Sequence, residues 1–509
     1  MDECSPVVIV GAGSAGLVLA IELARRGVAF RLIEKQSEPF GGSRGKGLQP
    51  RTLEVFQDIG VLDAVLQAGG LYPPIRNYAA DGTTSDACEA PRRASVAEPY
   101  PNSIMLPQSR TEEILRARLL ELGHQPEWGT ELLAIRIDQD RISATIRTPQ
   151  GQEELSPRYL VGTDGGRSTV RKQLDIPFPG ETRPTRMIIA DLPVQSLSFD
   201  AWHRWRDAPG GAFALCPLAG TNLFQMAAEI DAESEVDLSS DAIRQLITER
   251  TGNANLVAGD PVWTSLYQVS FRLAGHYRVG NTLIVGDAAH IHPPTGGQGL
   301  NTSVQDAYNL GWKLAAVLSG APDALLDSYE GERRPVAAGV LGMSEKLLGA
   351  MIEKGDMRRG RETLQLDLHY RASPLTLETR ADREGVQAGD RAPDAILHDG
   401  HGAPIRLFDL FAHPGFTLLA YRCNGDLSSL ASIPSVRLAN IDRPDAAYAD
   451  TTASFRSIYG VAANTLLLVR PDGYIALGAK GDEPGLVLDW LKRWPDLAAD
   501  MPAHAICAQ

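Results

Sequence analysis

Apolar positions at the start of the chain come in short blocks separated by glycines. Residues 7–10 read VVIV, a continuous apolar run typical of a strand buried on both faces of a parallel sheet. In the segment SAGLVLAIELARRG that follows, apolar residues recur at helical spacing, and residues 30–33 form a second apolar run. This order of strand, helix and strand predicts a βαβ unit.

The next stretch alternates between helical and strand patterns. We predict a helix over residues 51–68 and another that begins at Ser109, because Ser109 and Glu112 fit a capping box. Residues 133–137 and 142–146 are spaced like the two strands of a β-hairpin. The apolar run YLVG predicts a further buried strand.

From about residue 182 onward the pattern is mainly that of strands. The predicted strands cover residues 187–192, 212–215, 223–230 and 265–273. A buried strand returns at residues 283–285, and a long amphipathic helix follows over residues 299–318. The first domain is therefore interrupted by a second. The predicted division is a discontinuous first domain (1–75, 103–181 and 277–345), a sheet-rich domain (76–102 and 182–276), a helical linker (346–387) and a C-terminal α/β domain (388–509).

Composition narrows the class of protein. The 509 residues carry a formal net charge of −14, which argues against binding to a nucleic-acid backbone. The five cysteines are scattered without metal-ligand spacing, so we expect no metal site and a reducing, cytoplasmic location. No apolar run approaches ~18 residues, so we expect no membrane span.

Gly11, Gly13 and Gly16 form a G-x-G-x-x-G pattern between the first predicted strand and helix. Gly11 permits a tight turn, Gly13 lets a phosphate approach the backbone, and Gly16 lets the helix pack on the strand. Glu34, at the end of the next strand, is placed to accept hydrogen bonds from a ribose. The pattern predicts a dinucleotide site but does not separate FAD from NAD. The predicted site includes the neighbouring residues Ser14, Ala15 and Lys35.

A second glycine-rich stretch, GDAAHIHPPTGGQGLN, occupies residues 286–301. Asp287 follows a predicted strand, at the edge where open α/β sheets bind ligands, and its carboxylate suits a ribityl or ribose hydroxyl. Three glycines then lead into a helix N-terminus, whose N–H groups favour negative charge. A flavin exploits such a site, because its reduced ring carries negative charge near N1 and C2.

A third motif, YLVGTDGGRSTVR, places Asp164 and Gly165 directly after a predicted strand. An Asp-Gly pair at this point marks a turn. Ser168 and Arg171 are suited either to a phosphate or to an ion pair. The residues themselves leave a structural turn and a nucleotide contact equally open.

These three motifs, in this order, resemble the class A (single-component) FAD-dependent aromatic hydroxylases, such as phenol hydroxylase and the hydroxylases of aromatic polyketides. The resemblance covers about residues 5–345 and includes residues 42–63. It implies that Arg44 and Gln108 contact the pyrophosphate and ribityl part of FAD. It also implies that Asp287 binds the ribityl or pyrophosphate region, and that Asp164 and Gly165 serve both FAD and NAD(P)H. The residues implied to line the isoalloxazine are Pro293, Gly296, Gly299, Leu300 and Asn301.

The resemblance also implies an architecture. A Rossmann-like FAD domain of the para-hydroxybenzoate hydroxylase type is interrupted by a β-sheet substrate domain that closes over the flavin ring. The C-terminal unit resembles the thioredoxin-like domain of phenol hydroxylase, but Cys423 has no neighbouring cysteine, so we expect a structural or oligomerisation role. The family pattern is compatible with a homodimer. No second dinucleotide fingerprint occurs, so NADPH or NADH is expected to bind transiently.

The implied reaction is hydroxylation of a phenolic ring with NAD(P)H and O2 through a C4a-(hydro)peroxyflavin. Tyr267 and Arg272, in a predicted strand, and Pro293, beside the flavin, are the catalytic candidates; Tyr267 and Arg272 fit the surface of a sheet equally well. His290 and His292 fit loop histidines bonded to backbone better than bases. Trp202 and Trp205, in WHRW, suit either a substrate pocket or core packing.

Four alternatives stay open at this point. A simple FAD oxidase or dehydrogenase is possible, but the stretch GDAAHIHPPTGGQGLN favours the hydroxylases. A Baeyer–Villiger monooxygenase would use the same scaffold on a ketone. A halogenase is disfavoured, because WHRWRD lacks the W-x-W-x-I-P spacing. A non-catalytic protein that binds flavin or an aromatic ligand belongs to a different class. The likeness to polyketide hydroxylases favours a bulky polycyclic phenol as substrate.

Overall fold

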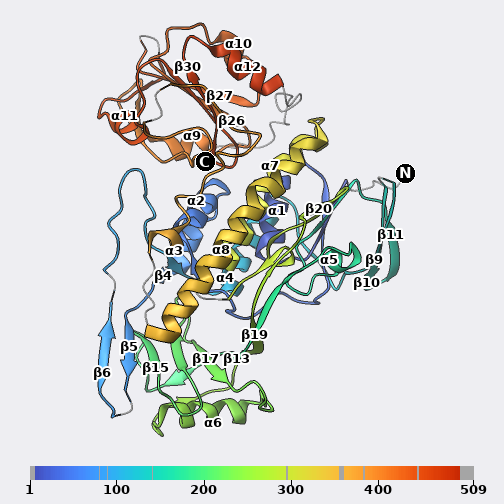
Figure 1. Cartoon of the computed structure of the whole chain (residues 1–509), viewed down its shortest axis with the longest axis vertical. Helices are drawn as coiled ribbons and strands as arrows, with labels where there is room; N and C mark the ends of the chain where they lie inside the picture. The colour runs from blue at the N-terminus through green and yellow to red at the C-terminus, as the bar shows by residue number, and fades with distance from the viewer. Residues whose placement is uncertain are drawn as a thin grey trace.

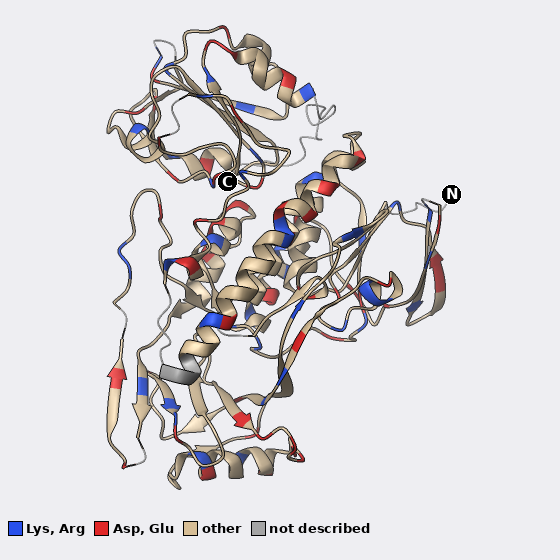
Figure 2. Cartoon of the chain, viewed as in Figure 1, with Lys and Arg blue, Asp and Glu red and all other residues tan. Residues whose placement is uncertain are grey.

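The computed structural model describes residues 6–79, 81–88, 90–139, 141–293, 296–354, 360–381, 384–443 and 446–492 (Figure 1). The C-terminal unit lies at one end of the long axis and a sheet covered by helix α6 (Ser240–Thr251) at the other. Between them lies the N-terminal α/β part. Figure 2 shows Lys and Arg interspersed with Asp and Glu along the chain in all three parts.

A six-stranded sheet forms the centre of the N-terminal part, in the order β20-β21-β12-β1-β2-β8. Strand β1 (Val7–Val10) pairs in parallel with β2 (Phe30–Glu34) and with β12 (Tyr159–Gly162). Strand β21 (Thr282–Ile284) pairs in parallel with β12. Because parallel strands end at the same edge, this order brings the three glycine motifs together. The remaining strands are β8 (Glu127–Trp128) and β20 (Arg278–Val279), and helix α1 (Ser14–Ala24) follows β1.

An eight-stranded sheet, in the order β22-β19-β13-β17-β16-β15-β5-β6, forms the second part. Its strands are β5 (Ile75–Tyr78), β6 (Thr84–Ala87), β13 (Gly180–Leu192), β15 (Trp202–Trp205), β16 (Phe213–Pro217), β17 (Phe224–Ile230), β19 (Trp263–Leu273) and β22 (His290–Ile291). One face packs on α6 through residues such as Ile188, Met226 and Ile243. Alternation along the strands leaves the neighbouring residues 187, 189 and 227 on the opposite face.

The helix predicted over 51–68 is two helices, α2 (Pro50–Asp58) and α3 (Leu62–Ala68). They separate at Gly60, whose φ of +79° is left-handed and cannot continue a helix. Helix α4 (Gln108–Glu121) begins one residue before the predicted Ser109 and has no side-chain cap. The predicted capping box is therefore wrong. The hairpin prediction is confirmed by the antiparallel strands β9 (Glu131–Asp138) and β10 (Arg141–Thr148).

Helix α7 (Gly299–Leu318) has the predicted bounds, and α8 (Asp327–Lys354) follows it. The helix predicted for residues 346–387 ends at 354 in the part of the chain that is described. Residues 361–364 form a short 3₁₀ turn, and β23 (Leu377–Glu378) joins the C-terminal sheet beside β30. Leu375 is buried there and its carbonyl accepts from Trp490 Nε1 at 3.2 Å, so packing on the C-terminal unit overrides the helical pattern.

The C-terminal unit is an eight-stranded mixed sheet, in which β26 pairs in parallel with β27 and antiparallel with β29. Its strands after β23 are β24 (Ile396–Asp399), β25 (Pro404–Arg406), β26 (Phe416–Tyr421), β27 (Val436–Ile441), β28 (Tyr448–Ala449), β29 (Thr465–Val469) and β30 (Ile475–Lys480), and its helices are α9 (Leu407–Phe411), α10 (Ser428–Ala431), α11 (Ser454–Tyr459) and α12 (Pro484–Lys492). The Cys423 thiol lies 3.3 Å from the Thr465 carbonyl oxygen. Burial raises the pKa of this thiol to about 11, so it stays protonated at neutral pH.

Buried charges join the C-terminal unit to the N-terminal part. Arg470 Nη1 lies 2.7 Å from Glu332 Oε1 on α8, and its Nη2 lies 2.5 Å from Asp472 Oδ2. Lys313 Nζ, on α7, lies 2.7 Å from Glu332 Oε2. All four side chains are buried. Burial alone would raise the pKa of Glu332, but Arg470 and Lys313 outweigh it and hold that pKa well below its usual range.

We expect Arg470→Met to lower the free energy of unfolding by about 3 to 5 kcal/mol, because Glu332 and Asp472 would stay buried with less compensating charge. Chemical denaturation followed by tryptophan fluorescence measures the change. Arg244→Met on α6 is the matched control, since it removes an arginine whose partners Asp241 and Asp260 are exposed. Equal unfolding midpoints for the two variants would contradict this expectation.

Candidate functional site

One cavity of about 1260 Å³ collects residues from all three glycine motifs and from the second sheet. The predicted cofactor residues that line it are Gly11, Gly13, Ser14, Ala15, Glu34, Lys35, Arg44, Gln108, Asp164, Gly165, Asp287, Pro293, Gly296, Gly299 and Leu300. Residues of β13, β17 and β19 line its other end. Segments separated by more than a hundred residues therefore converge on a single hollow.

The first glycine motif shapes one wall. Gly11 has a φ of +108°, and a Cβ added there would stand 2.7 Å from the Thr163 carbonyl oxygen. A Cβ on Gly16 would approach the Gly11 carbonyl oxygen to 2.0 Å, so Gly16 serves packing and does not line the cavity. On Gly13 the nearest atom would be 3.7 Å away. Gly13 is thus the position of the motif that leaves room for a ligand.

Glu34 and Glu112 hold the loop before α1 from two sides. Glu34 Oε2 accepts from the Ala12 N–H at 2.9 Å. Glu112 Oε1 accepts from the Ser14 N–H at 3.1 Å, from the Ser14 hydroxyl at 3.0 Å and from Gln108 Nε2 at 2.8 Å. Burial raises the pKa of Glu112. The predicted capping box pairs Glu112 with Ser109 on its own helix and does not include the contact with Ser14.

The second motif forms the opposite wall. The side chain of Asp287 is exposed to the cavity, and the surrounding protein raises its carboxyl pKa, although His290 and Arg44 act in the other direction. His290 is buried and does not line the cavity, and its Nε2 lies 2.6 Å from Asp306 Oδ2. Asp306 also accepts from Arg333 Nε at 2.6 Å. His290 therefore belongs to a buried network behind the site.

Helix α7 begins at the cavity. Among the described residues, the N–H groups of Gly299 and Leu300 have no hydrogen-bond partner. Asn301 is placed differently from the prediction: it is buried and does not line the cavity. Its amide donates to the Gly47 carbonyl at 2.7 Å, and its Oδ1 accepts from the Gln49 N–H at 2.7 Å. Asn301 thus clamps the loop before α2 against α7.

The Asp-Gly motif has a structural role, and one of its carboxylate oxygens is left for a ligand. Asp164 Oδ2 accepts from the Thr169 N–H at 2.6 Å and so caps helix α5 (Thr169–Gln173). Asp164 Oδ1 is buried and has no hydrogen-bond partner in the described part of the chain. Arg171 is structural, since its guanidinium donates to the Ala288 carbonyl at 2.9 Å and lies over the Phe178 ring.

The three catalytic candidates differ in whether they line the cavity. Tyr267 and Pro293 line the cavity. Arg272 does not line the cavity: it donates to the Phe178 carbonyl at 3.1 Å and to the Thr182 hydroxyl at 3.0 Å, so these contacts do not favour the predicted catalytic role. Trp202 lines the cavity, whereas Trp205 packs in the core and stacks on Tyr78.

Burial sets the acid–base character of the cavity. It raises the pKa of Tyr267 well above its usual range, so the hydroxyl stays protonated and can serve as a hydrogen-bond donor. Burial, with His290 beside it, lowers the pKa of His292 to about 3, so this ring is neutral at physiological pH. Its Nε2 is buried and without a partner among the described residues.

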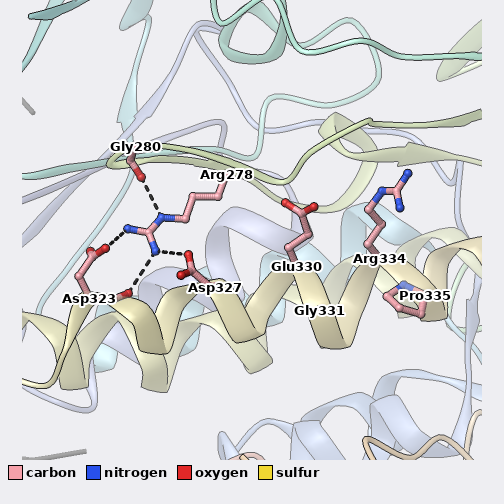
Figure 3. A pocket seen from close by; sticks show the side chains of 8 residues that line it. All are labelled: Arg278, Gly280, Asp323, Asp327, Glu330, Gly331, Arg334 and Pro335. Atoms are coloured by element: carbon pink, nitrogen blue, oxygen red, sulfur yellow. Dashed lines mark hydrogen bonds and ion pairs between the residues drawn. The ribbon is translucent and has the colours of Figure 1, made fainter. Parts of the chain in front are cut away.

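A second hollow of about 690 Å³ lies between β20 and α8 (Figure 3). Its charged groups already have partners: Arg278 pairs with Asp323 and Asp327, and Glu330 accepts from the Tyr277 N–H at 2.8 Å. Arg334 Nε donates to the Ala274 carbonyl at 3.0 Å. This hollow therefore offers little unsatisfied chemistry to a ligand.

Family comparisons agree with this geometry. Residues 4–344 match the family described as FAD binding domain, and residues 386–498 match the C-terminal region of aromatic-ring hydroxylases. The chain belongs to the FAD-dependent aromatic-ring hydroxylases. It is an FAD-dependent monooxygenase.

Individual relatives cover nearly the whole chain. A flavin-dependent monooxygenase of Mycobacteroides abscessus is 41% identical over 96% of this chain and 99% of that protein. A 12-dehydrotetracycline 5-monooxygenase/anhydrotetracycline 6-monooxygenase of Streptomyces rimosus subsp. rimosus is 35% identical over 96% of this chain and 98% of that protein. Aklavinone-11 hydroxylase, solved with FAD and aklavinone, is 29% identical with a TM-score of 0.82, covering 96% of this chain and 98% of that chain.

The residues present fit FAD. Two loops offer N–H groups with no partner in the described part of the chain: those of Gly13 and Ala15 at α1, and those of Gly299 and Leu300 at α7. Such N–H groups suit a pyrophosphate and an electron-rich ring edge, respectively. The unpaired Asp164 Oδ1 provides an acceptor between them. Separately, none of the described helices is both long and apolar enough to cross a membrane.

Gly13→Ala and Gly16→Ala should have different effects. The methyl group in Gly13→Ala stands in the cavity, so we expect FAD to dissociate at least about tenfold more readily while the apoprotein keeps its stability. In Gly16→Ala the methyl group collides with the Gly11 carbonyl, which costs about 1 to 3 kcal/mol of folding free energy. Thermal unfolding without FAD and FAD titration measure the two effects. If Gly13→Ala and Gly16→Ala lost FAD affinity and apoprotein stability to the same extent, this division of roles would be wrong.

Proposed function

We propose that this monooxygenase hydroxylates a polycyclic phenolic substrate with NAD(P)H and O2. The supporting observation is one continuous cavity that joins the FAD loops to the inner face of the second sheet. Relatives that act on tetracycline intermediates and on aklavinone favour a polycyclic substrate. The cavity volume of about 1260 Å³ also exceeds the range of about 300 to 1,000 Å³ usual for ligand pockets.

The proposed cofactor contacts come from the two walls of the cavity, which the first and second glycine motifs form. The N–H groups of Gly13 and Ala15 would hold the pyrophosphate, and Glu34 would accept from the ribose. Asp287 would bind the ribityl region, and the first turn of α7 would face the isoalloxazine. When bound, FAD supplies the redox chemistry that takes electrons from NAD(P)H and activates O2 for transfer of one oxygen atom.

The inner face of the second sheet would hold the substrate. Met187, Ile189 and Ala227 give an apolar surface at alternate positions of β13 and β17, and Trp202 adds an aromatic ring. The protonated Tyr267 hydroxyl would donate a hydrogen bond to a substrate oxygen. The apolar surface would exclude water while the oxygen atom is transferred. NAD(P)H would bind transiently, since the sequence has no second fingerprint.

The proposed function is tested with purified holoprotein and a set of polycyclic phenols. We expect a yellow protein whose NAD(P)H oxidation accelerates with substrate, and a product that carries one atom from isotopically labelled O2 on the ring. An ester or ring-opened product would assign a Baeyer–Villiger reaction instead. Tight binding of the phenols without NAD(P)H oxidation would identify a binding protein.

Tyr267→Phe tests whether this hydroxyl is a base or a donor. Because its pKa is raised, the hydroxyl cannot accept a proton between about pH 5 and 9, and His292 with a pKa of about 3 does not titrate there either. We expect Tyr267→Phe to raise KM severalfold and to leave the shape of the pH–rate profile unchanged. Loss of an ionisation step from that profile would show that Tyr267 acts as the base.

A further inference from the structure

The cavity contains a lysine that lies near a buried carboxylate, Asp191, but forms no direct ion pair with it. Lys46 lines the cavity and lies after the loop that carries Arg44. Its Nζ donates to Gln225 Oε1 at 2.5 Å and lies 4.5 Å from the centre of the Trp202 ring. It forms no ion pair with any residue that the structure describes. An ammonium group has three N–H donors, so at least one is left for a ligand.

A buried network fixes this lysine in place. The Ser43 N–H and hydroxyl donate to the two carboxylate oxygens of Asp191, at 2.7 and 2.5 Å. Gln225 Nε2 donates to the Ser43 carbonyl at 2.9 Å, while its Oε1 accepts from Lys46. Asp191 is buried, and both of its oxygens are engaged. The loop that carries Lys46 is thus tied to β13 and β17.

The other cations of the cavity have different surroundings. Lys35 follows Glu34 at the end of β2, and Arg167 follows the Asp-Gly motif. Arg44 is close enough to Asp287 to oppose the rise that burial causes in the pKa of that carboxyl. Arg186 Nη1 donates to the carbonyls of Ala232 and Ser234, each at 2.9 Å. Among these cations, Lys46 is the one placed against Trp202 and the second sheet.

Tyr267, His292 and Asp191 are each unsuited to act as the base for a phenol at neutral pH. Tyr267 stays protonated, the ring of His292 is neutral with a low pKa, and Asp191 is fully hydrogen-bonded. A positive charge beside a phenol favours the ionised form, which is also the more electron-rich ring. Trp202 Nε1 is buried and without a partner among the described residues, so a second donor stands beside Lys46.

We propose that Lys46 binds the substrate's phenolic oxygen as the phenolate, with Trp202 against the aromatic ring, so that a charge replaces a catalytic base. The O–H bond breaks on binding, its proton goes to solvent, and the oxygen keeps the electron pair and accepts a hydrogen bond from Lys46 Nζ. No oxidation or reduction occurs in this step. The inference rests on the proposed function and names acidic phenols as the substrate class. Of the charged groups around Lys46, Asp191 on β13 interacts with it electrostatically, and Arg44 precedes it in the chain.

The test follows the ionisation of a bound probe in the oxidised holoenzyme without NAD(P)H. The probe is 1,2-dihydroxyanthraquinone, which changes colour when its phenol ionises. We expect its apparent pKa on the wild-type enzyme to lie about one to two units below that of the free probe, the range expected for one nearby opposite charge. Lys46→Met should abolish the shift, and Lys46→Arg should retain most of it. Lys172→Met, on the exposed side of α5, is the matched control and should behave as wild type.

Binding affinities for the probe and for its dimethyl ether show whether the substitution acts on the phenol oxygen or on the site as a whole. Lys46→Met should bind the probe about tenfold more weakly, which corresponds to one pKa unit, and should bind the probe's dimethyl ether as the wild-type enzyme does. FAD content, measured by absorbance, shows whether the variant keeps its cofactor. A variant that loses FAD is replaced by Lys46→Arg and Lys46→Gln, which differ in charge.

Three results would overturn the inference. In the first, the wild-type enzyme leaves the probe unbound or its pKa unshifted. In the second, Lys46→Met shifts the probe's pKa as much as the wild-type enzyme does. In the third, Lys46→Met loses affinity for the phenol and for its dimethyl ether equally. These results are distinct from failure of the proposed function. That function fails when no phenol gives an oxygenated product, whatever Lys46 does. A hydroxylated product together with an unchanged shift in Lys46→Met would leave the function standing and remove the role of Lys46.

Discussion

Buried ion pairs fix helix α7, and the position of α7 determines the chemistry at its N-terminus. Asp306, in the second turn of the helix, is held by Arg333 and His290 at 2.6 Å each. Lys313, further along, is held by Glu332 at 2.7 Å. Such pairs are expensive to bury and costly to break one partner at a time, so they favour a single placement of the helix. The free N–H groups of Gly299 and Leu300 therefore meet the cavity in a fixed direction.

The C-terminal unit completes this arrangement. Arg470 and Asp472 close the network around Glu332, and Arg391 Nη1 reaches Glu54 on α2 at 2.9 Å. These contacts tie the C-terminal sheet to α2, α7 and α8 by packing and charge, and none of them involves the Cys423 thiol.

Sequence reasoning succeeded where the signal is local. The run VVIV, the glycine spacing at Gly11 and the bounds of α7 depend on neighbouring residues, and the structure agrees with them. It failed where a side chain chooses a distant partner. Glu112 bonds Ser14 across 98 positions, Asn301 reaches Gln49 across 252, and Arg272 reaches Phe178 across 94. No periodicity or spacing encodes these contacts, because they exist only after the strands have paired. Gly60 is a local indication of a break, because a glycine disfavours the interior of a helix. The prediction of one helix over residues 51–68 does not take it into account.

The insertion of the second sheet into the first also dictates an order of events during synthesis. Strand β21 pairs with β12, although the second sheet's main strands lie between them in the chain. The central sheet therefore stays one parallel strand short until residue 284 has left the ribosome, and α7 follows only later. During that interval the edge of β12 is open to pairing with other chains. The loops that line the cavity are consequently complete only after β21 and α7 have been synthesised.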